Sequence, residues 1–291
     1  MNGRALSVAP KTESTTVEFG RATLSAERVR TNAQIVHPTV SIIIPAKNEA
    51  RNLPYVLPHL PHWAHEVILV DGNSSDGTAE VAKLLCERIQ VVQQKGRGKG
   101  AALRTGFALA TGDIIVMLDA DGSMNPGEIP AYLGVLLTGA DVAKGSRFLQ
   151  GGGTHDMGRI RYAGNLFLTW LLRLLHGGQY SDLCYGYNAF WRRVLAEIKL
   201  DADGFEIETQ LNVRILQAGL RIHEVPSFEA GRIHGDSNLN AFRDGWRVFK
   251  TIVGEWFLPR VERLHSEEIG TLRLSTPQPL SIAASNPRQF D

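Results

Sequence analysis

The stretch that decides the fold is "DIIVMLDAD" (residues 113–121), an apolar run rich in β-branched residues that ends in two aspartates. Two earlier stretches have the same form, "TVSIIIPA" (39–46) and "EVILVDG" (66–72). Short, continuous apolar runs are typical of parallel strands that are buried on both faces. We therefore predict three buried strands, each followed by polar residues.

Weaker strands are expected at 88–94 and 140–148, and helical patterns at 49–60, 77–87 and 99–110 lie between the strands. Strands that alternate with helices predict a mainly parallel sheet covered on both sides, a three-layer α/β domain. In such sheets ligands bind beyond the carboxyl ends of the strands. The polar residues that end the strands should therefore meet at one rim.

Composition narrows the class of protein. The chain has 291 residues, 43% of them hydrophobic, enough to bury a core without disulfides or a structural metal. A formal net charge of +1 gives no general attraction for nucleic acid. Neither Cys86 nor Cys184 belongs to a CxxC pair, which favours a reduced, cytoplasmic setting. Neither a secretory signal nor a membrane-spanning run is predicted.

The two ends of the chain differ from its middle. Residues 1–37 are polar and weakly periodic, and we interpret them as an N-terminal tail or arm. Residues 263–291 are similarly polar and form a predicted C-terminal tail. The α/β domain is expected to occupy residues 38–262.

The pair Asp119 and Asp121 is the first candidate for chemistry. Residues two apart in a strand point to the same side, so both carboxylates could reach one cation at the strand end. Mg²⁺ and Mn²⁺ prefer oxygen ligands and commonly bind one or two carboxylates together with substrate phosphates. The pair alone is equally compatible with two solvated aspartates, so the prediction of a metal site depends on its neighbours.

Three neighbours on the predicted rim support a ligand site. Asp71 ends its strand, where a carboxylate can accept hydrogen bonds from a base or a ribose hydroxyl. Glu49 follows the first strand, and the alternative role for it is to cap the next helix. Asp76 or Ser75, by contrast, is expected to cap the helix at 77–87. Lys99 lies in "KGRGKGAALRTG" (95–106), where the free N–H groups of a helix N-terminus would favour phosphate.

These motifs together resemble family-2 glycosyltransferases of the GT-A fold, and within them the dolichyl- or polyprenyl-phosphate sugar synthase branch. The resemblance covers roughly residues 38–250. The motifs that carry it are, in order, "IIIPAKNEARNL", "ILVDGNSSDGT", "GKGAALRTGF", "VMLDADGSMNP", "GSRF", "SDLCYGYNAFWRRVL", "GFEIETQL" and "GRIHGDSNLNAF". It implies a Rossmann-like α/β/α domain and an inverting, metal-dependent sugar transfer from a nucleotide sugar.

The resemblance also implies a role for each matching residue. On the donor side it implies nucleoside and phosphate contacts from Pro45, Glu49, Asp71, Lys99, Asp119, Arg232 and Ser237. Asp119 and Asp121 would hold Mg²⁺ or Mn²⁺ on the donor diphosphate. Arg147 would lie near the phosphates, and Asp182 at the sugar and acceptor end. Glu206, with Glu208, matches a donor-side acidic motif.

One departure leaves the metal site incomplete. Ser123 stands where the lipid-linked branch commonly has glutamine, so a third protein ligand is missing. His234 could supply that ligand, or could simply bond a phosphate. A hydroxyl acceptor would need a general base, and Asp182 is the candidate, with Glu206 behind it.

We expect transfer of a sugar from a UDP- or GDP-sugar to a polyprenyl phosphate at the inner membrane face. The alternative is a soluble hydroxyl acceptor such as a glycan or secondary metabolite. A nucleotidyltransferase or a non-catalytic nucleotide-binding protein is a third reading, but the glycine-rich signature expected directly after the first strand is absent.

Two helical segments carry heavy apolar stripes. The first is "GRIRYAGNLFLTWLLRLLHGG" (158–178), and the second is "AFRDGWRVFKTIVGEWFLPR" (241–260), which also carries basic residues. The second segment has two interpretations, an interfacial helix in peripheral contact with a membrane or a helix whose stripe packs on the domain.

Overall fold

The structure is a computed structural model that describes residues 37–236 and 239–258. The predicted tails therefore lie outside the described residues, except for His37. A compact unit begins at Pro38. Within the described ranges, no helix combines the length and apolar character that crossing a bilayer requires.

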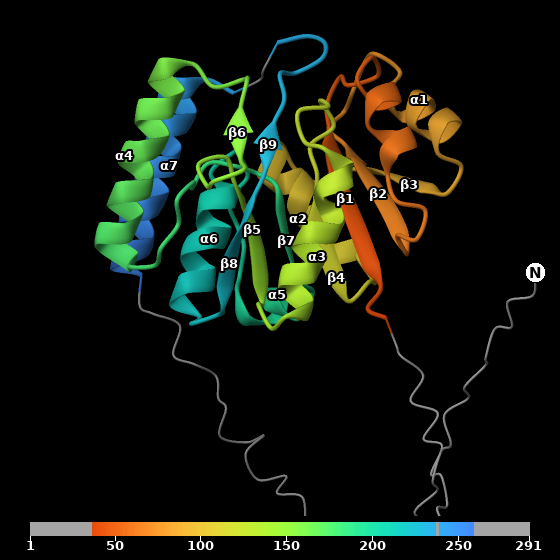
Figure 1. Ribbon diagram of the computed structural model, residues 1–291. Coiled ribbons are helices and arrows are strands. Elements are labelled where there is room, and N and C mark those ends of the chain that lie inside the picture. The colour runs from red at the N-terminus through yellow and green to blue at the C-terminus, as the bar shows by residue number, and fades with distance from the viewer. Residues whose placement is uncertain (1–36, 237–238, 259–291) are drawn as a thin grey trace, which may run out of the picture. The chain divides into compact units, whose positions relative to one another are not determined.

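A seven-stranded sheet forms the centre of the domain (Figure 1). Its strand order is β3-β2-β1-β4-β7-β5-β8. The strands are β1 (Val40–Ala46), β2 (Glu66–Asp71), β3 (Ile89–Gln93), β4 (Ile114–Met117), β5 (Val142–Ser146), β7 (Asn188–Trp191) and β8 (Ile222–Pro226). All neighbouring pairs are parallel except the two that involve β7, which runs antiparallel to β4 and β5. The mainly parallel sheet is confirmed, and β7 and β8 are additions that the sequence did not predict.

Helices cover both faces of the sheet, as expected for strands that are apolar on both sides. Ile42 and Ile44 pack on one side with α1 (Thr78–Leu85) and α3 (Ile129–Leu137). Ile43, between them, packs on the other side with α2 (Lys99–Leu109), α5 (Val194–Glu197) and α6 (Ile207–Gln217). All three isoleucines are fully buried. This alternation explains why the strand is a continuous apolar run.

The predicted helix at 49–60 is wrong in kind. The chain instead forms two short 3-10 helices, η1 (Leu53–Tyr55) and η2 (Leu57–His59). Pro54 and Pro58 stand early in these turns. A proline inside a continuous α-helix would remove a hydrogen bond and clash with the preceding turn, so this segment cannot form one.

Two long helices, α4 (Arg159–His176) and α7 (Ala241–Phe257), lie side by side at one end of the sheet (Figure 1). Leu168 and Leu172 of α4 share a small core with Val248 and Ile252 of α7 and with Val213 of α6. A two-stranded parallel sheet of β6 (Gly153–Thr154) and β9 (Phe228–Glu229) completes the fold.

Burial in the sheet predicts a sharp contrast between two leucines. Leu69 is fully buried in β2, whereas Leu84 of α1 is 86% exposed. Leu69→Ala should lower the free energy of unfolding by about 2–5 kcal/mol, because it leaves a cavity in the core. Leu84→Ala should change it by less than about 0.5 kcal/mol. Urea unfolding of both variants measures the difference, and equal effects would contradict this packing.

Candidate active site

A cavity of about 420 Å³ opens beyond the carboxyl ends of β1 and β4. Its volume lies within the usual range for small-ligand sites. The sequence-predicted residues that line it are Pro45, Glu49, Lys99, Asp119, Asp121 and Arg232. Residues far apart in the chain therefore meet at one rim of the sheet, as the strand pattern predicted.

The aspartate pair lines the cavity, but not through strand alternation. Strand β4 ends at Met117, and both aspartates lie in the turn that follows. Asp121 Oδ1 accepts hydrogen bonds from the Ser123 N–H (3.0 Å) and from the Ser123 hydroxyl (2.7 Å). Ser123 therefore orients Asp121, which gives this residue a local role.

Lys99 joins two acidic residues across the cavity. Its Nζ lies 2.7 Å from Asp119 Oδ1 and 2.7 Å from Glu208 Oε1. A side chain at Gly186 would place a Cβ 2.5 Å from Glu208 Oε1 and 3.1 Å from Lys99 Nζ. The glycine of "CYGYNAF" therefore makes room for this ion pair.

The electrostatics show an excess of negative charge around Lys99. Burial alone would lower the pKa of Lys99, but the charges of Asp119 and Glu208 outweigh it and raise that pKa. Burial raises the pKa of Asp119 to about 6, and Asp121 and Glu208 add to this rise while Lys99 opposes it. One ammonium group thus pairs with two carboxylates, an arrangement that additional positive charge would stabilise.

The expected phosphate site at the N-terminus of α2 is wrong. The N–H groups of Gly100 (2.8 Å) and Ala101 (3.2 Å) both donate to the backbone carbonyl of Asp203. A Cβ on Gly100 would lie 2.3 Å from the carbonyl oxygen of Ala202. This glycine therefore serves the close approach of two backbone segments. Of the glycine-spaced motif, Gly98, Lys99 and Ala102 line the cavity.

Arg232 crosses the rim and binds two carboxylates. Its Nη1 lies 3.1 Å from Asp121 Oδ2, and its Nη2 contacts Glu49 Oε1. Burial raises the pKa of Glu49, although bonds from Asn52 and Arg232 oppose the rise. The Glu49 side chain makes these contacts and does not cap a helix. The residue at the N-cap of η1 is Asn52, and its side chain makes no capping hydrogen bond.

His234 is not brought to the aspartate pair. Its ring packs against Tyr55, with centroids 5.6 Å apart, and does not line the cavity. Its backbone N–H donates to Asn52 Oδ1 at 2.9 Å. The described residues hold no group of three or more His, Cys, Asp or Glu side chains arranged for a metal. The suggested third ligand is therefore not found, and Ser237 lies outside the described residues.

Asp71 lies at the end of β2 but does not line the cavity. Its Oδ2 accepts from the Ser74 N–H at 3.1 Å, while Oδ1 is buried without a hydrogen-bond partner among the described residues. Asp76 Oδ1 accepts a hydrogen bond from the Thr78 N–H at 3.1 Å. Asp76 stands one residue before Gly77, the N-cap residue of α1. Asp76 therefore bonds the first turn of the predicted helix.

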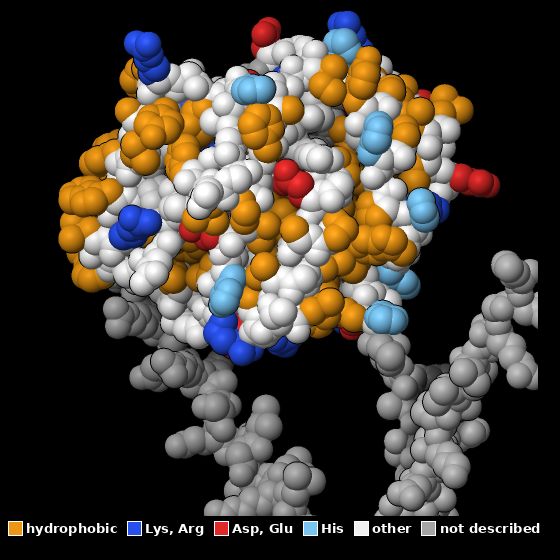
Figure 2. Space-filling view, viewed as in Figure 1, with side chains coloured by type: hydrophobic (Ala, Val, Ile, Leu, Met, Phe, Trp, Pro, Cys, Tyr) orange, Lys and Arg blue, Asp and Glu red, His pale blue; other side chains and the backbone are white. Residues whose placement is uncertain are grey.

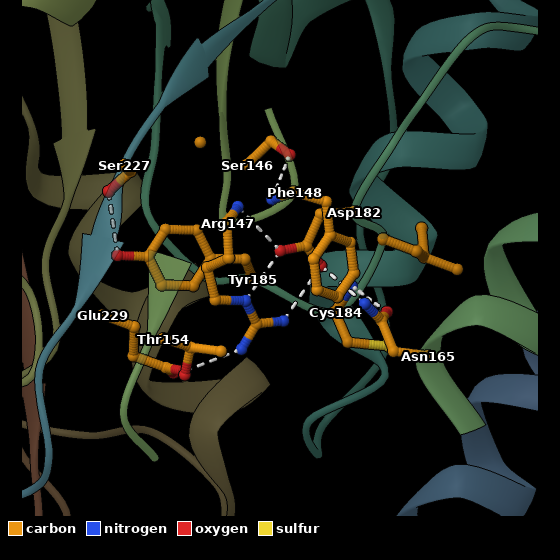
Figure 3. Close-up of polar contacts among 12 residues, drawn as sticks. Ser146, Arg147, Phe148, Thr154, Asn165, Asp182, Cys184, Tyr185, Ser227 and Glu229 are labelled. Atoms are coloured by element: carbon orange, nitrogen blue, oxygen red, sulfur yellow. Dashed lines mark hydrogen bonds and ion pairs between the residues drawn. The ribbon is translucent and has the colours of Figure 1, made fainter. Parts of the chain in front are cut away.

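Arg147 lies beneath the cavity instead of among its phosphate-facing residues. Its guanidinium binds Asp182 through Nε (2.7 Å) and Nη2 (2.9 Å), and Glu229 through Nη1 (3.0 Å) (Figure 3). The Tyr185 ring covers the guanidinium, 4.8 Å from its carbon. Only Tyr185 and Glu229 of this cluster line the cavity. Arg147 therefore supports the floor of the site.

Asp182 cannot act as the general base predicted from the sequence. It is fully buried, and Asn165 occupies its Oδ1 at 2.8 Å in addition to Arg147. Burial alone would raise the pKa of Asp182, but the hydrogen bonds and charge of Arg147 outweigh burial and hold that pKa below its usual value. A carboxylate that is buried and engaged on both oxygens positions Arg147 and does not contact a substrate.

Glu206 is also misplaced by the sequence prediction. It stands at the N-cap of α6, where Oε1 accepts from the Gly204 N–H at 3.1 Å, and it does not line the cavity. Glu208, two residues later, is the acidic residue of this motif that lines the cavity. The motif was located correctly, but the residue that faces the ligand space is the other one.

Three arginines that the sequence prediction missed line the far side of the cavity. Arg161 comes from the first turn of α4, and Arg243 and Arg247 come from the first turns of α7. Arg161 pairs with Asp156, which also lines the cavity, at 3.1 Å. The sequence signal was present as basic residues at the starts of two amphipathic segments, but only the fold directs both starts toward the sheet rim.

Comparison with known proteins agrees with this geometry. Residues 41–199 match glycosyl transferase family 2. The chain is 33% identical over 215 residues to glycosyltransferase AglJ of Haloferax volcanii, covering 72% of this chain and 69% of the relative. It is 33% identical over 236 residues to the polyprenol monophosphomannose synthase of Mycolicibacterium smegmatis, covering 76% and 88%.

A solved structure shares the fold. Glucosyl-3-phosphoglycerate synthase from Mycobacterium tuberculosis, in complex with Mn²⁺, UDP and glucosyl-3-phosphoglycerate, superposes with a TM-score of 0.61 at 26% identity, over 76% of this chain and 81% of that chain. The fold is thus the GT-A fold of glycosyltransferases. The chain belongs to glycosyl transferase family 2 and is a glycosyltransferase. The nucleotidyltransferase and non-catalytic readings are set aside.

Because Asp182 is buried in an ion pair with Arg147, we expect its substitution to lower the stability of the fold and not to remove a catalytic group. Asp182→Asn should lower the free energy of unfolding by about 3–5 kcal/mol, because the buried Arg147 loses the carboxylate that binds it at two nitrogens and keeps only Glu229 as a charged partner among the described residues. Because the pKa of Asp182 is depressed, its stabilisation is present above the unfolded value of about 3.9 and is lost as pH falls through the folded pKa. Urea unfolding of both proteins across this range should show the difference shrinking in acid.

The matched control is Asp156→Asn. Its partner Arg161 and Asp156 itself are 31% and 35% exposed, so the loss should be below about 1 kcal/mol. An Asp182→Asn protein of normal stability that has lost only its turnover would restore the general-base assignment.

Proposed function

We propose that the protein transfers a sugar from a UDP- or GDP-sugar to a polyprenyl phosphate, with inversion at the anomeric carbon and with Mg²⁺ or Mn²⁺. The observation that carries the choice of acceptor is that the acidic residues of the cavity form ion pairs. In the described part of the chain, each of them has a basic partner. The pairs are Glu49–Arg232, Asp119–Lys99, Asp121–Arg232, Asp156–Arg161, Glu208–Lys99 and Glu229–Arg147.

This pairing favours an acceptor that is already ionised. A hydroxyl acceptor needs a general base within hydrogen-bond reach, and the base expected from the sequence, Asp182, is buried beneath the site. A phosphate monoester carries its own negative charge near neutral pH and can attack without a base. Three arginines of the cavity, Arg161, Arg243 and Arg247, share only two acidic partners within the described ranges, Asp156 and Asp244. The positive charge left over would attract such an acceptor.

The aspartate pair fits a divalent cation held jointly by the protein and the donor. Asp119 and Asp121 offer hard oxygen ligands on one side of the cavity, and Mg²⁺ commonly uses one or two carboxylates together with substrate phosphates. The surplus of carboxylates around Lys99 also favours an added cation. When bound, the metal would neutralise the charge that develops on the leaving nucleoside diphosphate.

The remaining donor contacts are proposed from the placement of the residues. Pro45 and Glu49 line the wall next to β1, where the nucleoside would lie, and the unpartnered Oδ1 of Asp71 is an acceptor beside this wall. Lys99 and Arg232 would stabilise the diphosphate once it displaces the carboxylates that these two cations now bind. Ser237 is proposed to join them from the segment that the structure does not describe.

Relatives and neighbours support two acceptor classes. The Mycolicibacterium relative is a polyprenol monophosphomannose synthase, which favours the lipid phosphate. The second candidate is a soluble acceptor, favoured by the structural neighbour that was solved with glucosyl-3-phosphoglycerate. The lipid acceptor would require peripheral contact with a membrane at its cytoplasmic face.

The metal site predicts ligand-induced stabilisation that depends on Asp121. UDP or GDP, whichever matches the donor, together with Mn²⁺ at about one hundred times their joint Kd should raise the Tm of the wild-type protein by roughly 5–10 °C. Asp121→Ala should lose most of this shift, because the cation loses one of two carboxylates, while Glu87→Ala, an exposed carboxylate outside the cavity, should keep it. An unchanged shift in Asp121→Ala, or in chelator, would refute the site.

The acceptor is tested by transfer assays with three compounds: a short polyprenyl phosphate, the matching polyprenol and 3-phosphoglycerate. Only the polyprenyl phosphate should be glycosylated efficiently. Arg247→Ala should raise its KM about tenfold, the cost of one charged hydrogen bond, and leave the KM of the nucleotide sugar unchanged. Faster transfer to 3-phosphoglycerate, or to the polyprenol, would favour the second candidate.

A further inference from the structure

The two long helices at the end of the sheet leave a large apolar surface exposed. On α4 the exposed side chains are Ile160, Tyr162, Leu166, Phe167, Trp170 and Leu174, between 44% and 65% accessible. On α7 they are Phe242, Trp246, Trp256 and Phe257, between 46% and 79% accessible. In Figure 2 hydrophobic side chains gather on the side of the molecule where Figure 1 places these helices. We refer to these ten side chains as the α4/α7 surface.

The charges on the same helices are one-sided. Helix α4 contains no acidic residue, and the two acidic residues of α7, Asp244 and Glu255, are only 2% and 5% accessible. The basic residues behave oppositely, since Arg159, Arg173, Arg243, Arg247 and Lys250 are all exposed. The buried Asp244 pairs with Arg243 and Arg247 at 3.3 and 3.5 Å, and a net positive charge remains on these helices. The outer faces thus combine aromatic side chains with positive charge and expose no acidic side chain.

The two helices run in the same direction, and both begin at the cavity. Their carboxyl-terminal ends meet where the His176 ring contacts Trp256 edge to face, with centroids 5.8 Å apart, and bonds the Ile252 carbonyl. At the opposite end, Arg161 of α4 and Arg243 of α7 line the cavity. The α4/α7 surface is therefore continuous with the arginine-lined side of the site.

We propose that the α4/α7 surface docks on a membrane that contains anionic phospholipid, and that this docking presents the arginine-lined side of the cavity to the lipid headgroups. Aromatic and aliphatic side chains with Lys and Arg around them are the composition that binds helices in the membrane interface. Each basic residue near an anionic surface adds to the attraction. The proposal rests on the proposed lipid-phosphate acceptor for its purpose, though not for its test.

In the docked orientation, the inward side of each helix packs in the core and the outward side contacts the membrane. Val248 and Ile252 face inward and hold α7 to α4 and α6. Phe242 and Trp246, on the outward side, have accessibilities of 78% and 58% and enter the interface. Trp246 stacks on Phe249, with ring centroids 5.0 Å apart, and neither Phe242 nor Trp246 belongs to the buried core between the helices. Changes on the outward side should therefore weaken membrane binding and leave the fold intact.

The test is flotation of the full chain with vesicles, without donor or metal. One set is phosphatidylcholine alone, and the other is an equimolar mixture of phosphatidylcholine and phosphatidylglycerol. The wild-type protein should bind the mixed vesicles, bind phosphatidylcholine far less, and lose binding as salt is raised. Trp170→Ser, and the double variant Arg173→Glu with Lys250→Glu, should each weaken binding about tenfold or more.

The matched control is Trp63→Ser, because Trp63 is 51% exposed and Trp170 is 55% exposed, yet Trp63 lies outside the α4/α7 surface. This control should bind vesicles like the wild type. Thermal unfolding of every variant shows that it is folded. None of the four substituted residues lines the cavity, so the matching nucleoside diphosphate with Mn²⁺ should still raise the Tm of each variant.

Several results would overturn the proposal. They are no binding to the mixed vesicles at low salt, an equal loss of binding in Trp63→Ser, and unweakened binding in Trp170→Ser. A concentration-dependent dimer that Trp170→Ser dissociates, without vesicle binding, would instead assign the surface to a second copy of the chain. Vesicle binding without any donor-induced Tm shift would refute the proposed function alone, and the reverse result would refute the docking surface alone.

Discussion

The site depends on two cations that hold together carboxylates from different parts of the chain. Lys99 links the turn after β4 to α6 through Asp119 and Glu208. Arg232 links that same turn to the segment after β1 through Asp121 and Glu49. Like charges gathered at one sheet rim would otherwise repel one another in a partly desolvated space. The ion pairs offset this repulsion. Under the proposed function, a metal and a diphosphate would take the place of these ion pairs.

A second ion-pair cluster lies below the first and carries out a different task. The Arg147 guanidinium joins β5 to the loop before β7 through Asp182, and to β9 through Glu229. These bonds therefore join three segments on the side of the sheet that contains the reversed strand β7. Tyr185 and Glu229 then reach the cavity from a rigid base. Removing water from such a pair is costly, so its value lies in specifying one arrangement of the loops.

The sequence predicted what is local and missed what is paired at a distance. The strands were recognisable because burial on both faces leaves a continuous apolar run, and the aspartates were recognisable because they end such a run. The sequence does not distinguish an arginine that forms buried ion pairs from one that binds phosphate. Arg147 was therefore expected near the phosphates, whereas it is buried beneath the cavity. The same holds for Glu206 and Glu208, which differ only in how α6 turns. Prolines, by contrast, are a local signal, and Pro54 and Pro58 were sufficient to exclude the helix predicted at 49–60.

The two interpretations of the segment at 241–260 turn out not to exclude each other. A helix of 17 residues has an inward and an outward side, and a segment can be apolar enough to supply both. Val248 and Ile252 pack in the core, whereas Phe242, Trp246 and Phe257 remain in solvent. Burying an aromatic side chain is among the largest single gains available to a fold, so leaving this many exposed beside basic residues is a feature that needs a partner. The absence of acidic side chains from the outward faces limits that partner to an anionic one. Since both helices begin at the arginines of the cavity, a negatively charged lipid surface satisfies the apolar, electrostatic and positional constraints together.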